Sequence, residues 1–143
     1  MPIAINGSGT ITGISAGGLP DDCITTADIA ANAVTTAKLG TSEASGLAKA
    51  WVNFNGTGTV AIRASFNVSS ITDNGTGNYT VNFTTALADA NYVTVIGTGA
   101  DGSGGSSFGT PSTYSTTAVI VQSRSVTGGA AVDETRFCVS IFR

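Results

Sequence analysis

The sequence predicts an all-β protein, in which a small antiparallel β-sandwich follows an extended N-terminal arm and a short segment of helical turns. Three observations lead to this prediction. Apolar and polar residues alternate along several short stretches after residue 50, as they do in half-buried strands. Only 10% of the 143 residues are charged, against roughly 25% in an average soluble domain. A ten-residue motif occurs twice before residue 40, in a stretch too short to build a core of its own.

Residues 1–22 are expected to form the extended arm. Glycine interrupts every possible helix in this stretch, and the large apolar residues are few: Ile3, Ile5, Ile11, Ile14 and Leu19. A segment with so little apolar surface does not fold by itself. We therefore expect the arm to become ordered against a neighbouring protein.

Residues 23–46 contain the repeated motif and a polar linker. Ile24–Ile29 reads Ile-Thr-Thr-Ala-Asp-Ile, and Val34–Leu39 reads Val-Thr-Thr-Ala-Lys-Leu. Each copy offers a threonine hydroxyl to cap one turn of helix, followed by an apolar residue. A single helical turn is not stable alone in water. The apolar residues therefore need a partner, which other copies of the same chain could supply.

The same stretch has a second interpretation, a continuous amphipathic helix over residues 26–39. Ile29, Ala33 and Ala37 would then share one face of the helix. The β-branched run at residues 34–36 disfavours a helix. We favour two short turns and keep the helix as the alternative.

Residues 47–143 are expected to form the sandwich. The predicted strands are Trp51–Asn55, Ile62–Val68, Tyr79–Phe83, Asn91–Ile96, Thr117–Gln122 and Arg136–Arg143. Asp73–Asn78 contains an Asn-Gly pair, which tolerates a positive φ at both central positions of a turn, so the second and third strands are expected to form a hairpin. A domain of about 90 residues is only marginally stable alone, and association with other copies would stabilise it.

A long loop is predicted over Gly97–Thr113. It begins with a G-x-G-x-x-G pattern, but no helix follows that could hold a pyrophosphate, so we interpret the pattern as loop. Loops of this length are often functional. Phe108, with Tyr114 just after the loop, suits a contact surface. The equally weighted alternative is a plain loop in which Phe108 packs on the core.

Residues for catalysis or cofactor binding are scarce. The chain has no histidine and two cysteines. We expect Cys138 to be a packed thiol within a strand, and expect both Cys23 and Cys138 to be reduced. The acidic residues lack the spacing of a calcium loop, and we interpret four of them as solvated turn residues: Asp89, Asp101, Asp133 and Glu134. We therefore predict no enzyme activity, no metal and no cofactor.

The charge and hydropathy of the chain limit the classes of partner that it is expected to bind. The net charge is −3 and the six basic residues are scattered, which argues against nucleic acid, because phosphate binding needs clustered cations. No apolar run approaches the ~20 residues of a membrane span. Met1–Ile5 lacks the basic start and the long apolar core of a secretory signal. We expect synthesis in a cytoplasm and no membrane insertion.

Three stretches resemble tail-fibre proteins of tailed bacteriophages. The tandem Thr-Thr-Ala-Asp-Ile and Thr-Thr-Ala-Lys-Leu units within Ile24–Leu39 resemble the repeats of fibre shafts. Ala50–Phe83 is similar to a C-terminal β domain common in those fibres, and Ile11–Asp21 looks like another recurring segment. The resemblance covers roughly half of the chain.

The resemblance implies a virion structural protein of the tail or baseplate that forms a homotrimer. Its arm would attach to the baseplate or other virion proteins, and its C-terminal knob would contact the host surface, with a glycan as the expected receptor. The residues expected near the three-fold axis are Ile24, Ile29, Val34 and Leu39. The residues expected to contact a receptor are Asp101, Ser106, Phe108 and Tyr114. The family carries no fixed catalytic residues.

The chain departs from this family in length, since it has one pair of repeats where long fibres have many. A short fibre near the baseplate, or a head-attached fibre or decoration protein, fits this length better than a long receptor probe. A different function class is a monomeric carbohydrate-binding β-sandwich. It needs an aromatic platform on one sheet face, for which the candidates are Trp51, Tyr79, Tyr92, Phe108 and Tyr114. Trp51 and Tyr79 are more simply interpreted as core anchors of their strands.

Overall fold

The computed structural model describes residues 27, 29–31, 33–40, 44, 46–99 and 107–143. The chain divides into two units, Met1–Leu39 and Gly40–Arg143. The predicted arm over 1–22 lies outside the described residues, as does Cys23.

The described residues of the first unit form short turns. The 3-10 turn η2 spans Thr36–Lys38, and the Lys38 amide donates to Thr35 O at 2.9 Å. Ala27, which occupies the position of Ala37 in the first copy of the motif, also has 3-10 geometry. Residues 29, 30 and 33 between these turns are not helical. The described residues therefore fit two separate turns and contradict a continuous helix.

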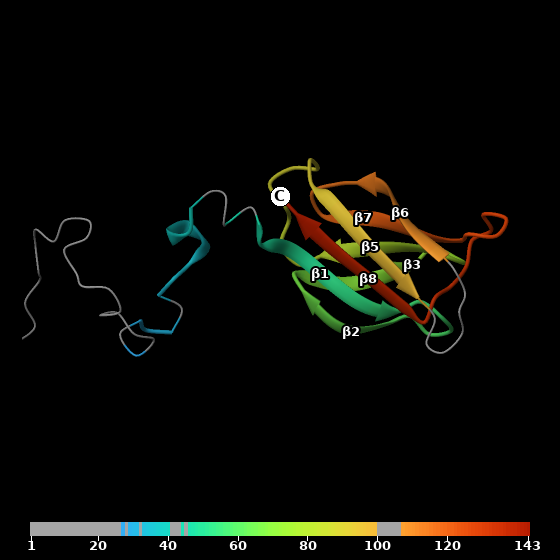
Figure 1. Cartoon of the computed structure of the whole chain (residues 1–143), viewed down its shortest axis with the longest axis horizontal. Coiled ribbons are helices and arrows are strands. Elements are labelled where there is room, and N and C mark those ends of the chain that lie inside the picture. Colours follow the sequence, from blue (N-terminus) through green and yellow to red (C-terminus); the bar gives the residue numbers. More distant parts are fainter. Residues whose placement is uncertain (1–26, 28, 32, 41–43, 45, 100–106) are drawn as a thin grey trace, which may run out of the picture. The chain divides into compact units, whose positions relative to one another are not determined.

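The second unit is a sandwich of two four-stranded antiparallel sheets, so the predicted all-β fold is confirmed (Figure 1). Sheet A, in the order β2-β1-β8-β5, lies toward the viewer in Figure 1, and sheet B, in the order β3-β4-β7-β6, lies behind it. The strands are β1 Ala48–Asn55, β2 Ala61–Phe66, β3 Val68–Asp73, β4 Asn78–Phe83, β5 Val93–Gly99, β6 Ser107–Tyr114, β7 Ala118–Ser125 and β8 Arg136–Phe142.

The two-residue period of a strand decides which side chains are buried. Alternate residues are buried along β1, β4, β7 and β8, the central strands of the two sheets. The core consists of Ala50, Val52, Phe54, Val68, Tyr79, Val81, Phe83, Tyr92, Val119, Val121, Phe137, Val139 and Ile141. The central strands thus supply most of the core, and the outer strands cover its margins.

Three aromatic rings join the sheets within this core. Phe54 and Phe137 are paired on neighbouring strands of sheet A, and their rings stack with centroids 5.0 Å apart. Tyr79 of sheet B meets both rings edge-on, at centroid distances of 5.2 Å and 5.5 Å. Truncating a buried ring of this kind to alanine typically costs about 3–5 kcal/mol, so the trio is a major contact between the sheets.

The predicted strand Ile62–Val68 is wrong, because the chain breaks there into β2 and β3, which belong to different sheets. The predicted hairpin partner of β4 is accordingly β3. The alternating pattern of residues 62–66 also does not place one side of β2 in the core. A register shift in the β1–β2 pair sets Ala64 opposite Asn53 but Ile62 opposite the core residue Phe54. Every residue of β2 is exposed.

The side chain of Asn67 holds the break between these strands. Its φ is 54°, the one positive value among the described non-glycine residues, and asparagine tolerates that region better than most residues. The Asn67 amide nitrogen donates to Lys49 O and to Thr85 O, both at 3.1 Å. Its Oδ1 accepts from the Thr85 amide at 2.8 Å. The chain thereby passes from sheet A to sheet B within one residue.

The predicted loop Gly97–Thr113 is also wrong at both ends, because β5 continues to Gly99 and β6 begins at Ser107. The glycines that indicated a loop have another use. A Cβ on Gly109 would collide with the side chain of Ile96, so glycine there lets β6 approach β5 closely.

The turn predicted at Asp73–Asn78 is confirmed in position and differs in detail. The Asn78 amide donates to Gly75 O at 2.9 Å, and the positive φ values fall at Gly75 and Gly77. Asn74 does not share them. The turn is therefore longer than the two-residue turn that the Asn-Gly pair predicts.

Two substitutions at Asn67 separate the contribution of its side chain from that of its backbone. Asn67→Gly keeps the left-handed conformation but removes the hydrogen bonds, and we expect a loss of about 1–3 kcal/mol in the free energy of unfolding. Asn67→Ala adds backbone strain of about 1 kcal/mol and should be less stable still. Urea unfolding followed by circular dichroism measures both losses. If Asn67→Gly were as stable as the wild type, the hydrogen bonds would contribute nothing.

Candidate functional site

The outward side of sheet A carries exposed apolar side chains, and we call it the apolar face. One row crosses all four strands, because Phe66 pairs with Trp51, Trp51 with Ser140, and Ser140 with Val95. Phe66 and Val95 are 55% exposed, and Trp51 is 39% exposed. Val93, 63% exposed, lies beside the outward-facing Phe142. Trp51 is therefore not the core anchor that the sequence suggests.

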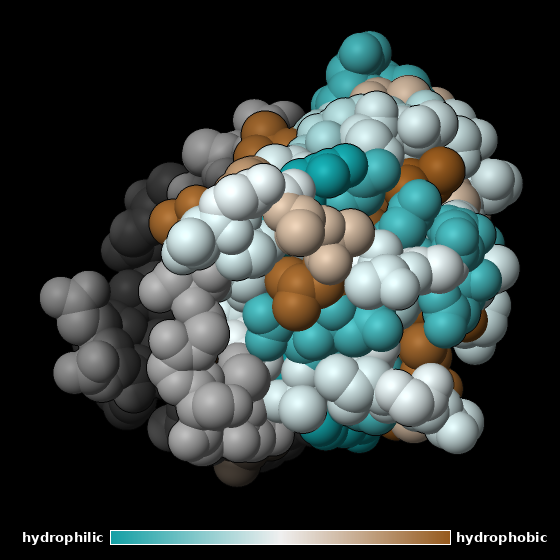
Figure 2. Space-filling view, turned by 90° about the vertical axis from the view of Figure 1, so that its right-hand side faces the viewer, coloured by the Kyte–Doolittle hydropathy of each residue, from teal (hydrophilic) through white to brown (hydrophobic). Residues whose placement is uncertain are grey.

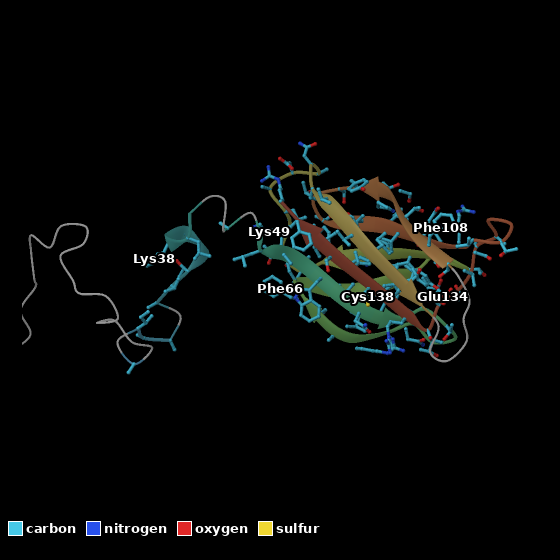
Figure 3. The ribbon with its side chains drawn as sticks, in the orientation of Figure 1. Lys38, Lys49, Phe66, Phe108, Glu134 and Cys138 are labelled. Atoms are coloured by element: carbon cyan, nitrogen blue, oxygen red, sulfur yellow. The ribbon has the colours of Figure 1, made fainter. Side chains whose placement is uncertain are left out.

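Polar side chains lie between and around these apolar ones, with Asn53 and Asn55 on the outward side of β1 and Arg136, Cys138 and Ser140 on that of β8. The Asn53 amide nitrogen donates to Cys138 Sγ at 3.1 Å. Cys138 lies within a strand, as expected, but its thiol is only half-buried, on the outward side of β8. Arg63 donates to Asn53 Oδ1 and to Phe54 O at the margin. The strands of sheet A contain no acidic residue. Figure 3 labels Phe66 and Cys138 on this sheet.

The outward side of sheet B is different in chemistry, and we call it the polar face. By register, it presents hydroxyl and amide side chains from all four strands: Ser70, Thr72, Asn78, Thr80, Asn82, Thr110, Thr113 and Gln122. Several are linked to one another. The Asn82 amide nitrogen donates to Ser70 Oγ at 3.1 Å and to Thr72 Oγ1 at 3.0 Å. The outer side of sheet B is thus mainly polar, with Ala118 and Ile120 of β7 as apolar members, whereas the large exposed apolar side chains of β1, β2 and β5 lie on sheet A.

Two of the four residues expected to contact a receptor lie in a strand and not in the predicted loop. Phe108 and Tyr114 both lie in β6. Phe108 pairs with Arg124 and is exposed on the polar face. Tyr114 pairs with the core residue Val119, and its ring lies 5.2 Å from that of Tyr92. Asp101 and Ser106 lie outside the described residues.

The four residues expected near a three-fold axis belong to the first unit. Ile29 and Val34 are exposed, and Leu39 is partly exposed. Ile24 lies outside the described residues. Ile29 and Val34 therefore lack cover from the described part of their own chain.

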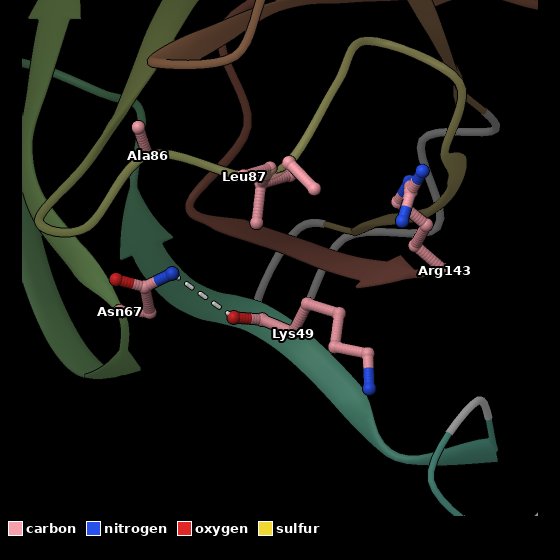
Figure 4. A pocket seen from close by; sticks show the side chains of 6 residues that line it. Lys49, Asn67, Ala86, Leu87 and Arg143 are labelled. Carbon is pink, nitrogen blue, oxygen red and sulfur yellow. Dashed lines mark hydrogen bonds between the residues drawn. The ribbon is translucent and has the colours of Figure 1, made fainter. Parts of the chain in front are cut away.

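A pocket of about 280 Å³ lies beside the start of β1 (Figure 4). Its lining consists of Lys49, Asn67, Ala86, Leu87, Ala88 and Arg143. Its two cations are already engaged, Arg143 with the Asp89 carboxylate and Lys49 with Ala44 O. The hydrogen bond from Arg143, and then that from the Asn91 amide, lower the pKa of Asp89 to about 2. We therefore assign the pocket no ligand.

A buried polar cluster surrounds the Tyr79 hydroxyl, which lies 2.6 Å from Asp133 Oδ1 and 2.7 Å from Gly56 O. The Gly77 amide donates to the same Asp133 oxygen at 2.6 Å. Burial, and then the hydrogen bond and charge of Asp133, raise the pKa of Tyr79 far above its usual value. A hydroxyl that stays protonated between two acceptors is suited to holding the β7–β8 connection, not to proton transfer.

Figure 2 shows the end of the sandwich that lies at the right in Figure 1. Hydrophilic and neutral residues predominate there, and hydrophobic residues occur only in small, separate groups (Figure 2). The described residues contain no group of three metal-ligating side chains and no helix long and apolar enough to cross a membrane.

Comparisons with protein-family models, with curated proteins and with solved structures found no match to this chain. The function must therefore be argued from the two outer faces. Sequence reasoning missed the apolar face because it assigned Trp51 to the core and followed a single alternation through Phe66. The signal available was the pair Val93 and Val95 on the second face of β5, in register with Phe142 of β8 and with the row that contains Trp51.

Two glycines with the same backbone conformation test the packing around the buried cluster. Gly77 and Gly58 both have a φ of 61°. A Cβ on Gly77 would lie 2.5 Å from Ser123 O and 2.7 Å from Val132 N, whereas nothing lies near one on Gly58. We expect Gly58→Ala to cost about 1–2 kcal/mol and Gly77→Ala at least ~2 kcal/mol more, as measured by urea unfolding. Equal losses of unfolding free energy in the two variants would show that the backbone around Gly77 can move to accommodate a Cβ at little cost.

Tyr79→Phe tests the hydroxyl itself. The substitution leaves Asp133 with one donor fewer and should cost about 1–3 kcal/mol at pH 8, while Tyr114→Phe, at a partly exposed ring, should cost less than ~0.5 kcal/mol. Because folding raises the pKa of Tyr79, this stabilisation is complete below the unfolded value near pH ~10 and falls as the pH rises above it. Wild type should therefore lose more stability than Tyr79→Phe between pH 8 and pH 11. An identical loss in the two proteins would contradict this role.

Proposed function

We propose that this chain is the subunit of a short homotrimeric fibre of a tailed bacteriophage, a structural protein of the virion whose β-sandwich contacts the host surface. The main support for this proposal is the apolar face. Within the described residues, no other part of the chain buries these exposed apolar side chains. Other copies of the chain cover the apolar face, and the polar face remains in water.

The size and composition of the apolar face suit a protein interface. The exposed parts of Phe66, Trp51, Val93 and Val95 amount to a few hundred Å², as large as the largest patch on a typical monomer. Aromatic enrichment and depletion of charge are typical of the core of an interface. The basic residues of sheet A lie toward its margins, which suits a polar rim.

A second copy is the occupant that best accounts for both units. Ile29 and Val34 of the first unit are exposed, as are Trp51 and Phe66 of the second. A heterodimeric partner would need two separate complementary surfaces. A ring of identical chains covers both sets at once, since each copy meets its neighbour through the same pair of surfaces.

The proposed number of copies and the proposed place in the virion rest on the resemblance to tail-fibre proteins. It supports three chains in a ring, attachment of the arm to the baseplate or other virion proteins, and contact of the knob with a host-surface glycan. The monomeric carbohydrate-binding module is the weaker candidate, because Tyr79 and Tyr92 of its platform are buried in the core.

The molar mass in solution tests the assembly. We expect size exclusion with light scattering to give three times the chain mass of 14.2 kDa. Trp51→Asp should lower the mass to that of one chain, because it buries a charge in the interface, and Ile29→Asp combined with Leu39→Asp should do the same.

Thr72→Asp is the matched control, since it adds the same charge to an exposed position of the polar face. It should leave the mass unchanged, and circular dichroism should show all variants folded. A single-chain mass for the folded wild type would overturn the proposal. A trimeric Trp51→Asp variant would remove the apolar face from the interface.

A further inference from the structure

We propose that the polar face binds an acidic saccharide at the β6–β7 end of sheet B, where Phe108 stacks on the sugar ring and Arg124 binds its carboxylate. This inference deepens the proposed contact with a host glycan and rests on it. It places the contact on a strand pair and names the chemical class of the ligand.

Phe108 and Arg124 are neighbours across the β6–β7 pair. Phe108 is 44% exposed, and Figure 3 labels it on β6. The next row along the same strands pairs Thr110 with Gln122, and Gln122 pairs in turn with Asn78 of β4. An aromatic ring therefore stands beside a guanidinium and a row of hydroxyl and amide groups.

The exposed ring is out of keeping with its surroundings. Apart from Ala118 and Ile120 of β7, the other uncharged outward residues of sheet B are serine, threonine, asparagine and glutamine, so a partner that covers Phe108 and its neighbouring row covers polar groups as well. A pyranose ring meets both requirements. Its C–H groups pack on an aromatic face, and its hydroxyl groups exchange hydrogen bonds with the amides and hydroxyls alongside.

Arg124 gives the site its charge preference. It is the one cation in the strands of sheet B, and the one acidic residue of those strands, Asp73, lies on β3 with β4 between them. A guanidinium binds carboxylates through parallel N–H donors. An isolated cation in a chain of net charge −3 therefore favours a sugar acid over a neutral sugar at this place.

Neighbouring groups hold Arg124 in position and leave donors for a ligand. Its Nη1 donates to Gly129 O at 3.2 Å and its Nη2 to Gln122 Oε1 at 3.4 Å. A guanidinium has five N–H donors, so further donors remain beyond these two contacts. Because Gln122 Oε1 accepts from Arg124, the Gln122 amide nitrogen is left to donate to a sugar hydroxyl. Such preorganisation lowers the entropic cost of binding.

The test uses the full chain on a surface array of uronate- and sialate-containing oligosaccharides, each beside its carboxyl-reduced counterpart. We expect binding to acidic members and at least tenfold weaker binding to their reduced forms. Phe108→Ala should weaken binding at least tenfold, whereas Phe108→Trp should retain it. Arg124→Ala should weaken binding and abolish the preference for the carboxylate.

Two control variants accompany these. Arg63→Ala removes an arginine from sheet A, and Thr72→Ala removes a hydroxyl from the far side of the polar face; both should bind as the wild type does. The inference is overturned if the wild type binds no acidic member, if reduced and acidic forms bind equally, or if Phe108→Ala binds unchanged. The molar mass of the same samples separates the two proposals. Trimers that do not bind would leave the fibre standing, and monomers that bind would leave only the saccharide site.

Discussion

The contact of Tyr79 with the opposite sheet is the constraint on which the rest of the sandwich depends. Its ring lies edge-on against Phe54 and Phe137, so the two sheets are held at the separation that these three rings define. Its hydroxyl lies against Asp133 and Gly56 O, which ties the β7–β8 connection to the same point. Apolar packing and the main buried hydrogen-bond cluster thus meet in one side chain, and the two outer faces keep their geometry because this centre is fixed.

The character of each outer face depends on the residues that its strands direct away from the core. Inward residues of both sheets are alike, mainly valine and aromatic rings. Outward residues differ, with Trp51, Phe66 and Val95 on sheet A and a lattice of hydroxyls and amides on sheet B. In the proposed assembly, another copy covers the outward side of sheet A, and the outward side of sheet B stays in water. The low charge of the chain is consistent with both, because neither a buried interface nor a saccharide surface is built from many charges.

The sequence alone predicted the fold class and the approximate position of most strands, because alternation along β4 and β8 is regular. It failed where one side chain or close contact outweighs the pattern. Asn67 turns a single alternation into two strands through its positive φ, and Gly109 belongs to a strand because β6 packs against Ile96. Neither contact is visible before the sheets are assembled. The apolar face was missed for a related reason, since alternation identifies a buried side but does not show that the opposite side of sheet A is also apolar.

The edge strands of the two sheets affect whether copies of this chain can pair through their strand edges. An open β-strand is a template on which further strands can add without limit. Here β6 carries Pro111 and a register irregularity next to it, and β2 turns into the other sheet through Asn67. Proline and irregular pairing both discourage growth by strand addition. In the proposed fibre, where copies meet at high local concentration, these features of β2 and β6 disfavour amyloid-like strand addition at those two edges and leave the sheet faces for association.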